Sequence, residues 1–142
     1  MSINADYLYH RIAEINDAID AIRAITSKRY TALKLEDKLA LRYLIIQLVE
    51  AAASICIHIL TEKYGEKPRG YPHCFTRLAE KGLIPKELGD RLAAAARLRN
   101  ILVHRYWNID DEKVYESAKH GTEDFATFAK IIGELARRSP SS

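Results

Sequence analysis

Cysteine is scarce in this chain of 142 residues, which contains only Cys56 and Cys74. Their separation does not match the ligand spacing of a zinc site, so no metal site is predicted. We interpret both residues as buried thiols in a reducing compartment, which favours the cytoplasm. The N-terminus lacks a basic stretch followed by an apolar one, so no signal peptide is predicted.

Long apolar runs are also lacking. No run approaches the length needed to cross a bilayer, so no membrane association is expected. There are only six glycines and four prolines, and neither strand alternation nor an internal repeat is visible. What the chain does contain is 48% apolar and 29% charged residues, a composition typical of a globular protein. We expect one domain over residues 1–142, with 137–142 as a frayed tail.

Apolar residues recur at spacings of three and four through most of the sequence, which predicts helices. Gly65 and Gly82 suit helix ends, and Pro85 suits the first position of a helix. We therefore expect an all-α, up-and-down bundle of four long helices and one short helix. Gly121 is expected to kink or divide the last helix. The predicted helices cover residues 4–25, 36–64, 74–81, 85 to beyond 99, and 110–137.

The helix predicted over residues 36–64 is apolar on nearly every side, so it must be buried in a bundle or against a second subunit. One thin polar line remains, formed by Gln47, Glu50, Ser54 and His58. The line is either a solvent-facing strip or, for Glu50 and Ser54, a support that orients polar groups of the helix after residue 85. Both alternatives stay open from the sequence.

Positive charge is concentrated in residues 67–107, which hold nine Lys/Arg and three Asp/Glu. The segments on either side are slightly acidic. Such a distribution suits a nucleic-acid ligand, although it also suits a basic segment that offsets acidic neighbours. Within it, the Gly- and Pro-rich loop over residues 66–72 carries Arg69 and Tyr71, which suit contact with a phosphate backbone or an ordinary polar loop equally.

The most chemically dense stretch is Arg99-Asn100-Ile101-Leu102-Val103-His104-Arg105-Tyr106-Trp107. Arg99 falls on the apolar stripe of its helix, where a charge is costly unless it is paired or reaches the surface. An arginine can hold a phosphate, and a histidine exchanges protons near neutral pH. At about 100° per residue, Arg99 and His104 lie about 140° apart. They could share one cleft through a distortion near Val103 or through a second subunit.

The spacing Arg-x4-His-x-Tyr resembles the signature of the HEPN superfamily, and more narrowly the HepT-like toxins of HepT/MntA toxin–antitoxin pairs. The run over residues 78–85 and the stretch over 107–110 resemble the same group, so the similarity covers essentially the whole chain. The resemblance implies a homodimer with a composite site at the interface. It also implies a cognate minimal nucleotidyltransferase antitoxin, of the MNT type, that transfers AMP to Tyr106.

The activity expected on this basis is endoribonuclease cleavage without a metal or cofactor. His104 would move the proton, Arg99 would stabilise the phosphoryl oxygens, and Asn100 would orient His104 or bind phosphate. Arg105 and Trp107 are expected to support RNA binding, although Arg105 stands where related chains often have an acidic residue. The alternative is a non-catalytic helical dimer that binds nucleotide or RNA and serves as partner subunit of a nucleotidyltransferase.

Overall fold

Five α-helices and one short 3-10 helix make up the computed structural model, which describes residues 3–105 and 107–139. No strand occurs in these ranges, so the prediction of an all-α bundle with four long helices and one short helix is confirmed. The elements are α1 (Ala5–Thr26), η1 (Tyr30–Ala32), α2 (Leu35–Tyr64), α3 (Tyr71–Glu80), α4 (Lys86–His104) and α5 (Asp111–Arg138).

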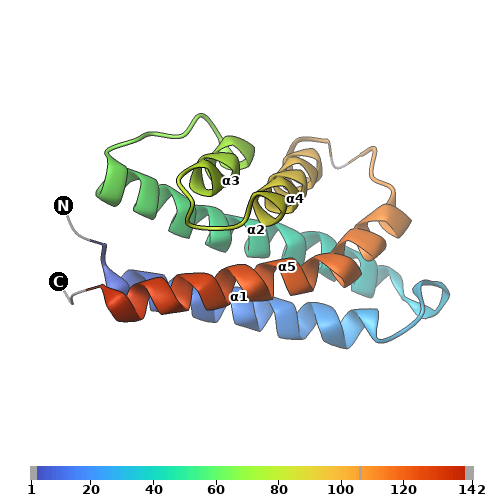
Figure 1. Ribbon diagram of the computed structural model, residues 1–142. Coiled ribbons are helices and arrows are strands. Elements are labelled where there is room, and N and C mark those ends of the chain that lie inside the picture. The colour runs from blue at the N-terminus through green and yellow to red at the C-terminus, as the bar shows by residue number, and fades with distance from the viewer. Residues whose placement is uncertain (1–2, 106, 140–142) are drawn as a thin grey trace.

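The helices form two groups joined by α2 (Figure 1). The long helices α1 and α5 pack along each other, and α1 also packs extensively on α2. The hairpin of α3 and α4 lies across the other side of α2. The described ends of the chain lie at one end of the bundle, whereas the beginning of α2 lies at the opposite end.

The central position of α2 explains its apolar sequence. Its side chains pack against α1, α3, α4 and α5, so most of its apolar surface is buried within one chain. Ile55 and Ile59 are completely buried, and each such side chain contributes about 2 kcal/mol. Ala51, Ala52 and Ala53 are also buried, and their small side chains allow neighbouring helices to approach closely.

By length and composition, α2 could also cross a membrane, because an 18-residue window reaches a mean hydropathy of 1.9. The expectation that no run approaches such a length is therefore wrong for α2. However, 56% of this window is buried inside the molecule, and a core helix of a soluble protein passes the same test.

Several helix boundaries follow the local chemistry. The Asn4 side chain accepts a hydrogen bond from the Tyr7 N–H (3.1 Å) and caps α1, and Asp110 caps α5 in the same way. Gly65 ends α2 with a φ of 65°, a left-handed conformation that glycine adopts without strain.

Other boundaries differ from the predictions. The short helix begins at Tyr71 instead of residue 74, because Pro72 lies in its first turn, where a missing N–H costs nothing. Pro85 precedes α4 instead of starting it. α5 is continuous through Gly121 and ends at Arg138, so neither the division at Gly121 nor a tail that frays from residue 137 is found. Residues 140–142 of the expected tail lie outside the described ranges.

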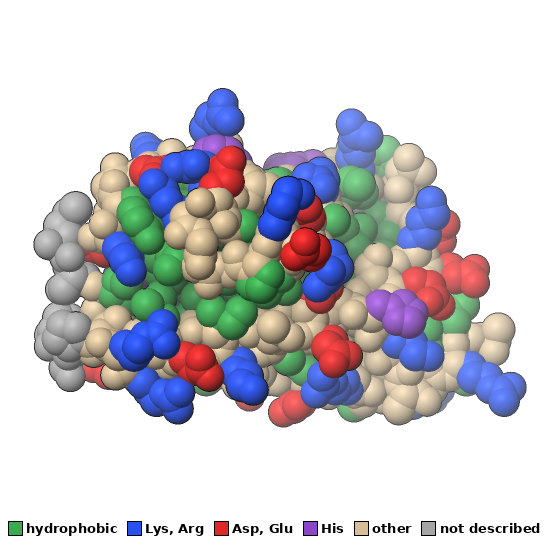
Figure 2. Space-filling view, viewed as in Figure 1, with side chains coloured by type: hydrophobic (Ala, Val, Ile, Leu, Met, Phe, Trp, Pro, Cys, Tyr) green, Lys and Arg blue, Asp and Glu red, His purple; other side chains and the backbone are tan. Residues whose placement is uncertain are grey.

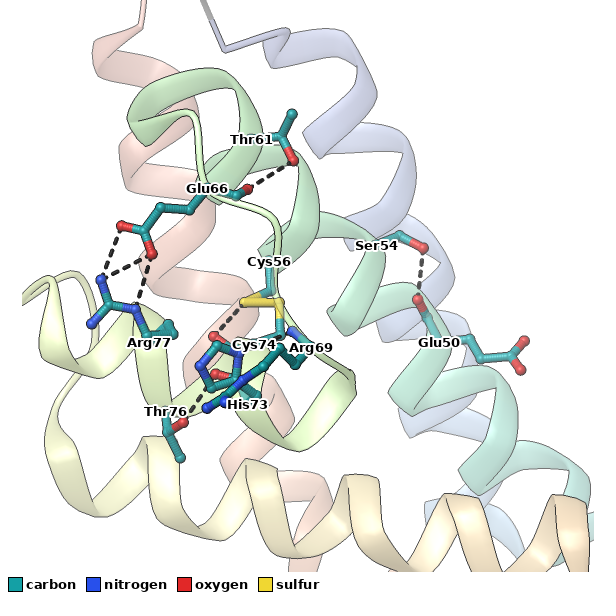
Figure 3. Close-up of a disulfide and its surroundings, with 10 residues drawn as sticks. All are labelled: Glu50, Ser54, Cys56, Thr61, Glu66, Arg69, His73, Cys74, Thr76 and Arg77. Carbon is teal, nitrogen blue, oxygen red and sulfur yellow. Dashed lines mark hydrogen bonds and ion pairs between the residues drawn. A yellow bond between two sulfur atoms is a disulfide. The ribbon is translucent and has the colours of Figure 1, made fainter.

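The two cysteines do not remain free. Cys56 on α2 and Cys74 on α3 form a disulfide between buried positions, which corrects the interpretation of reduced thiols (Figure 3). The residues are 18 apart in sequence, but the packing of α3 on α2 brings their Cα atoms to 6.1 Å, within the range that a disulfide spans. The bond fixes the start of α3 against the middle of α2.

The surface shown in Figure 2 is charged and mixed in sign. Lys and Arg side chains lie along the edge formed by α3 and α4 with acidic side chains among them, and both signs also occur over α5. Several cations of the basic segment pair with acidic neighbours, as Arg77 and Lys81 do with Glu66.

Candidate active site

Arg99 is held by side chains from α2, α3 and α4. Its Nη2 donates to the Glu50 Oε2 at 2.6 Å, and its Nη1 donates to the Asn100 Oδ1 at 3.1 Å. The guanidinium also lies over the ring of Tyr71, with its Cζ 4.7 Å from the ring centroid. The Arg99 side chain is only 17% exposed. The charge on the apolar stripe is therefore paired and does not extend to the surface, which resolves the conflict seen in the sequence.

The position of Tyr71 depends on the loop before α3. Glu66 accepts hydrogen bonds from Arg77 (3.0 and 2.9 Å) and pairs with Lys81, and Thr61 bonds to the Glu66 backbone (Figure 3). These contacts with Lys81 and then Arg77 lower the pKa of the Glu66 carboxyl below its usual value. The ion pairs of Glu66 fix the start of the loop, and the disulfide of Cys74 fixes the start of α3. The chain between these two points therefore places Tyr71 against Arg99.

The polar line of α2 forms the floor of a cavity of about 360 Å³ beside Arg99. Glu50 does face the motif helix, as one of the two alternatives predicted. The Ser54 hydroxyl donates to the Glu50 carbonyl within α2 (2.8 Å) and reaches the same cavity. His58 neither contacts Arg99 nor lines this cavity, and its Nε2 accepts a hydrogen bond from the Asn4 N–H (3.0 Å). The residues around the cavity are Arg11, Glu14, Tyr43, Ile46, Gln47, Glu50, Ala51, Ser54 and Tyr71.

A second, more open cavity of about 400 Å³ lies on the other edge of α4. It is lined by Arg97, Asn100, Ile101, His104 and Arg105. No carboxylate lines it, and neither Arg97 nor Arg105 forms an ion pair within residues 3–105 and 107–139. The arginines give this cavity a positive field that suits a phosphate.

Arg97 is the residue of this cavity that the sequence interpretation missed. It precedes Asn100 by three residues and His104 by seven, so all three share one face of a regular helix. The sequence contains this spacing, but the Arg-x4-His pattern, which begins at Arg99, does not include Arg97.

Arg99 and His104 occupy different edges of α4. The helix is regular through His104, so the distortion near Val103 that could have brought them together is not found. Asn100 is the link between the edges, since its amide oxygen binds Arg99 and its side chain lines the His104 cavity. A site that uses both Arg99 and His104 on one phosphate therefore favours a second copy of the chain over a single protomer.

The other predicted residues are more dispersed. The exposed Arg69 lies beside His73 and the disulfide, and its backbone N–H donates to the His73 Nδ1 at 3.0 Å (Figure 3). The structure does not bring it to Arg99. Trp107 is 73% exposed just beyond α4. Tyr106, the predicted modification site, lies outside the described residues. In the part of the chain that the structure describes, no three His, Cys, Asp or Glu side chains cluster as metal ligands.

The sequence profile described as "Ribonuclease HepT-like" matches residues 15–132 of this chain. The chain belongs to the HepT-like ribonuclease family. Both the resemblance seen in the sequence and the prediction of an enzyme of the ribonuclease class are thereby confirmed.

Relatives of known description agree with this assignment. The HepT-like chain is 30% identical to the mRNA nuclease HepT of Shewanella oneidensis over 130 residues, 89% of this chain and 96% of the relative. It is 27% identical to the tRNA nuclease HepT of Aphanizomenon flos-aquae over 97 residues, 68% of this chain and 66% of the relative. A solved structure of the tri-AMPylated Shewanella oneidensis HEPN toxin in complex with MNT antitoxin superimposes with a TM-score of 0.83 at 27% identity. The match covers 91% of this chain and 98% of that one.

Proposed function

We propose that this HepT-like protein is a toxin that acts as a metal-independent endoribonuclease in the cytoplasm. A cognate nucleotidyltransferase antitoxin neutralises it by transferring AMP to Tyr106. The observation that carries the proposal is the pairing of a fixed arginine, Arg99, with a basic cavity that contains His104 and Asn100. The names of the relatives, two nucleases and one AMPylated toxin, support both halves of the proposal.

In the proposed reaction, the 2′-oxygen of RNA attacks the adjacent phosphorus and the 5′-oxygen of the next nucleotide leaves. His104 removes the proton from the 2′-hydroxyl, or in its protonated form gives a proton to the departing oxygen. Arg99 stabilises the charge on the non-bridging oxygens, and Asn100 positions the phosphate between the two edges. The products are a cyclic 2′,3′-phosphate and a free 5′-hydroxyl.

The site is completed by a homodimer, in which Arg99 of one protomer and His104 of the other share a phosphate. Ile101 and Val103, 44% and 37% exposed on the last turns of α4, would form part of the contact. Leu35 and Leu39 are also exposed, on the first turns of α2. Large exposed apolar side chains on a functional helix are typical of an interface.

One observation favours the alternative of a non-catalytic dimer. Glu50 already neutralises Arg99 at 2.6 Å, as it would in a purely structural ion pair. In that case the protein binds nucleotide or RNA and serves the nucleotidyltransferase as subunit and substrate, and no RNA is cut.

RNA cleavage by the purified protein separates the two functions. Wild type should cut total cellular RNA with a chelator present, and both Arg99→Ala and His104→Ala should lower the rate by about a hundredfold or more. Arg91→Ala is the matched control, because Arg91 is an exposed arginine on the same helix, paired with Asp124. Activity that disappears with a chelator and returns with magnesium contradicts the metal-independent reaction, and an inactive wild type supports the alternative.

A further inference from the structure

The cavity beside Arg99 has walls from three helices and no role in the proton transfer. α1 contributes Arg11 and Glu14, α2 contributes the polar line that includes Gln47 and Glu50, and α3 contributes Tyr71. Its volume of about 360 Å³ lies within the range of small-ligand sites.

The charges around this cavity cancel. Arg11 pairs with Glu14 at 2.8 Å, and Glu50 pairs with Arg99 at 2.6 Å. The cavity is therefore polar but nearly neutral, unlike the His104 cavity on the other edge of α4. A phosphate suits the basic cavity, whereas a neutral polar cavity suits an uncharged ligand with several hydrogen-bonding groups.

Aromatic rings at the cavity suit a flat ligand. Tyr43 is 64% exposed, and Tyr71 has the Arg99 guanidinium over its ring. Nucleic-acid bases stack on exposed aromatic rings such as that of Tyr43. Because the lining residues Glu50 and Tyr71 contact Arg99, a base in this cavity would belong to a nucleotide next to the phosphate that Arg99 is proposed to bind.

The free hydrogen-bonding groups on the floor select among the bases. Glu50 uses Oε2 to accept from Arg99, which leaves Oε1 to accept from a ligand. Gln47 lies three residues earlier on the same helix face, and its amide forms no hydrogen bond with the described residues. Guanine presents two adjacent donors, N1–H and the N2 amino group, and one acceptor, O6. A carboxylate oxygen can accept from the two adjacent donors while an amide N–H donates to O6, whereas adenine and cytosine each offer only one amino donor on this edge and uracil only one ring N–H.

We propose that this cavity is a guanine-binding subsite that holds the base beside the cleaved phosphate. The inference rests on the proposed ribonuclease function, which it extends by naming the nucleotide that the enzyme prefers. Tyr43 and Tyr71 contact the faces of the base, and Glu50 and Gln47 bind its hydrogen-bonding edge.

Binding of the four nucleosides tests the subsite without any cleavage. Guanosine, titrated into the full-length protein and followed by NMR, should shift the Gln47 side-chain amide and the Tyr43 and Tyr71 ring signals. Gln47→Leu and Tyr43→Ala should each weaken guanosine binding by about tenfold or more. Asn16→Leu and Tyr9→Ala are matched controls, because both residues are exposed on α1 away from the cavity. Equal binding of all four nucleosides, no binding, or binding that survives Gln47→Leu overturns the proposal.

Cleavage of short RNAs that contain one guanosine among adenosines gives the second readout. The expected result is a cut beside the guanosine in wild type and a loss of that preference in Gln47→Leu, with cleavage elsewhere retained. Cleavage without base preference overturns the subsite and leaves the ribonuclease function intact. Guanosine binding by a protein that cuts no RNA overturns the ribonuclease function and supports the cavity as a nucleotide-binding site.

Discussion

Glu50 determines how Arg99 can act, because it is the only carboxylate bonded to Arg99 within the described residues. The Glu50 side chain is 44% exposed and Arg99 17%, so the pair lies at the edge of the core. The salt bridge with Glu50 uses Nη2 of the guanidinium. The other N–H groups of Arg99 can donate to Asn100 and to a ligand. In the proposed reaction, this salt bridge would reduce the number of orientations that Arg99 samples before it binds a phosphate.

We expect Glu50→Gln to lower the RNA cleavage rate on the order of tenfold, because a neutral amide holds the guanidinium less firmly. The cost in the free energy of unfolding should be only about 1 kcal/mol, since Glu50 is partly exposed. Single-turnover cleavage and urea denaturation measure the two effects. Glu123→Gln is the matched control, an exposed glutamate on α5 whose replacement should change neither quantity. An increase in rate would instead identify Glu50 as an inhibitor of Arg99.

For Arg99 on its apolar stripe, the sequence left two alternatives, an ion pair or extension to the surface, and the structure has the ion pair. Its partner Glu50 lies 49 residues away, and only the packing of α4 on α2 selects it over other acidic residues. The sequence could offer Glu50 as one alternative but could not decide, because helix periodicity fixes a face and not the neighbour that the face meets. The cavity residues Arg11 and Tyr43 were missed for the same reason.

The imidazole of His58 makes the free energy of unfolding depend on pH. Burial lowers the pKa of its imidazole below the ordinary value of 6.5, and nearby Glu62 only partly opposes this. The neutral ring accepts the Asn4 N–H and packs on Tyr7 with ring centroids 4.8 Å apart. Because the pKa of His58 is lower in the folded protein, the unfolded protein binds this proton at a higher pH than the folded protein does. The stabilisation is therefore complete above pH 6.5 and is lost as the pH falls towards the folded pKa.

Thermal unfolding above and below pH 6.5 measures this effect. Wild type should lose stability on acidification, and His58→Phe should lose less, since phenylalanine keeps the ring contact with Tyr7 but cannot titrate. Equal acid sensitivity of both proteins would assign the pH dependence to other groups.

At the scale of helices, the placement of α3 depends on its ties to α2. The sequence predicts this helix but starts it three residues late, because a proline is expected to break a helix, whereas Pro72 lies in the first turn of α3. The disulfide was not predicted, because contact between Cys56 and Cys74 exists only after α3 folds back on α2. Sequence spacing alone could not show that approach.

Reduction of Cys56–Cys74 should lower the free energy of unfolding by about 3 kcal/mol, as expected for release of a loop of this length. Urea denaturation with and without a reductant measures the change, and thiol alkylation confirms the state of the cysteines. The variant with both Cys56→Ala and Cys74→Ala is the control and should not respond to the reductant. Wild type that is equally stable under both conditions would contradict the expected role of the disulfide.

At the scale of the whole molecule, the regular α4 leaves Arg99 and His104 on separate edges, so the proposed dimer becomes testable by mixing inactive proteins. Arg99→Ala and His104→Ala are each expected to be inactive alone. In a mixed dimer, one of the two composite sites keeps both residues. Equal mixing with free exchange should therefore restore about a quarter of the wild-type cleavage rate. No recovery, in a mixture shown by mass spectrometry to contain mixed dimers, would place both residues of a site in one protomer.

The proposed nucleotidyltransferase partner would modify Tyr106, which lies two residues beyond His104 in the sequence. A phenol hydroxyl is a poor base at neutral pH, but it can accept a nucleotidyl group. AMP there would add a negative charge beside Arg105 and a bulky base near His104, which would exclude RNA.

Tyr106→Phe should thus keep RNA cleavage but escape silencing by the cognate partner with ATP. Intact-mass spectrometry beside a cleavage assay measures both properties, with Tyr9→Phe as a control that should still be modified and silenced. If Tyr106→Phe is still modified and silenced, the acceptor is another residue, and the charge argument must then be applied to that position.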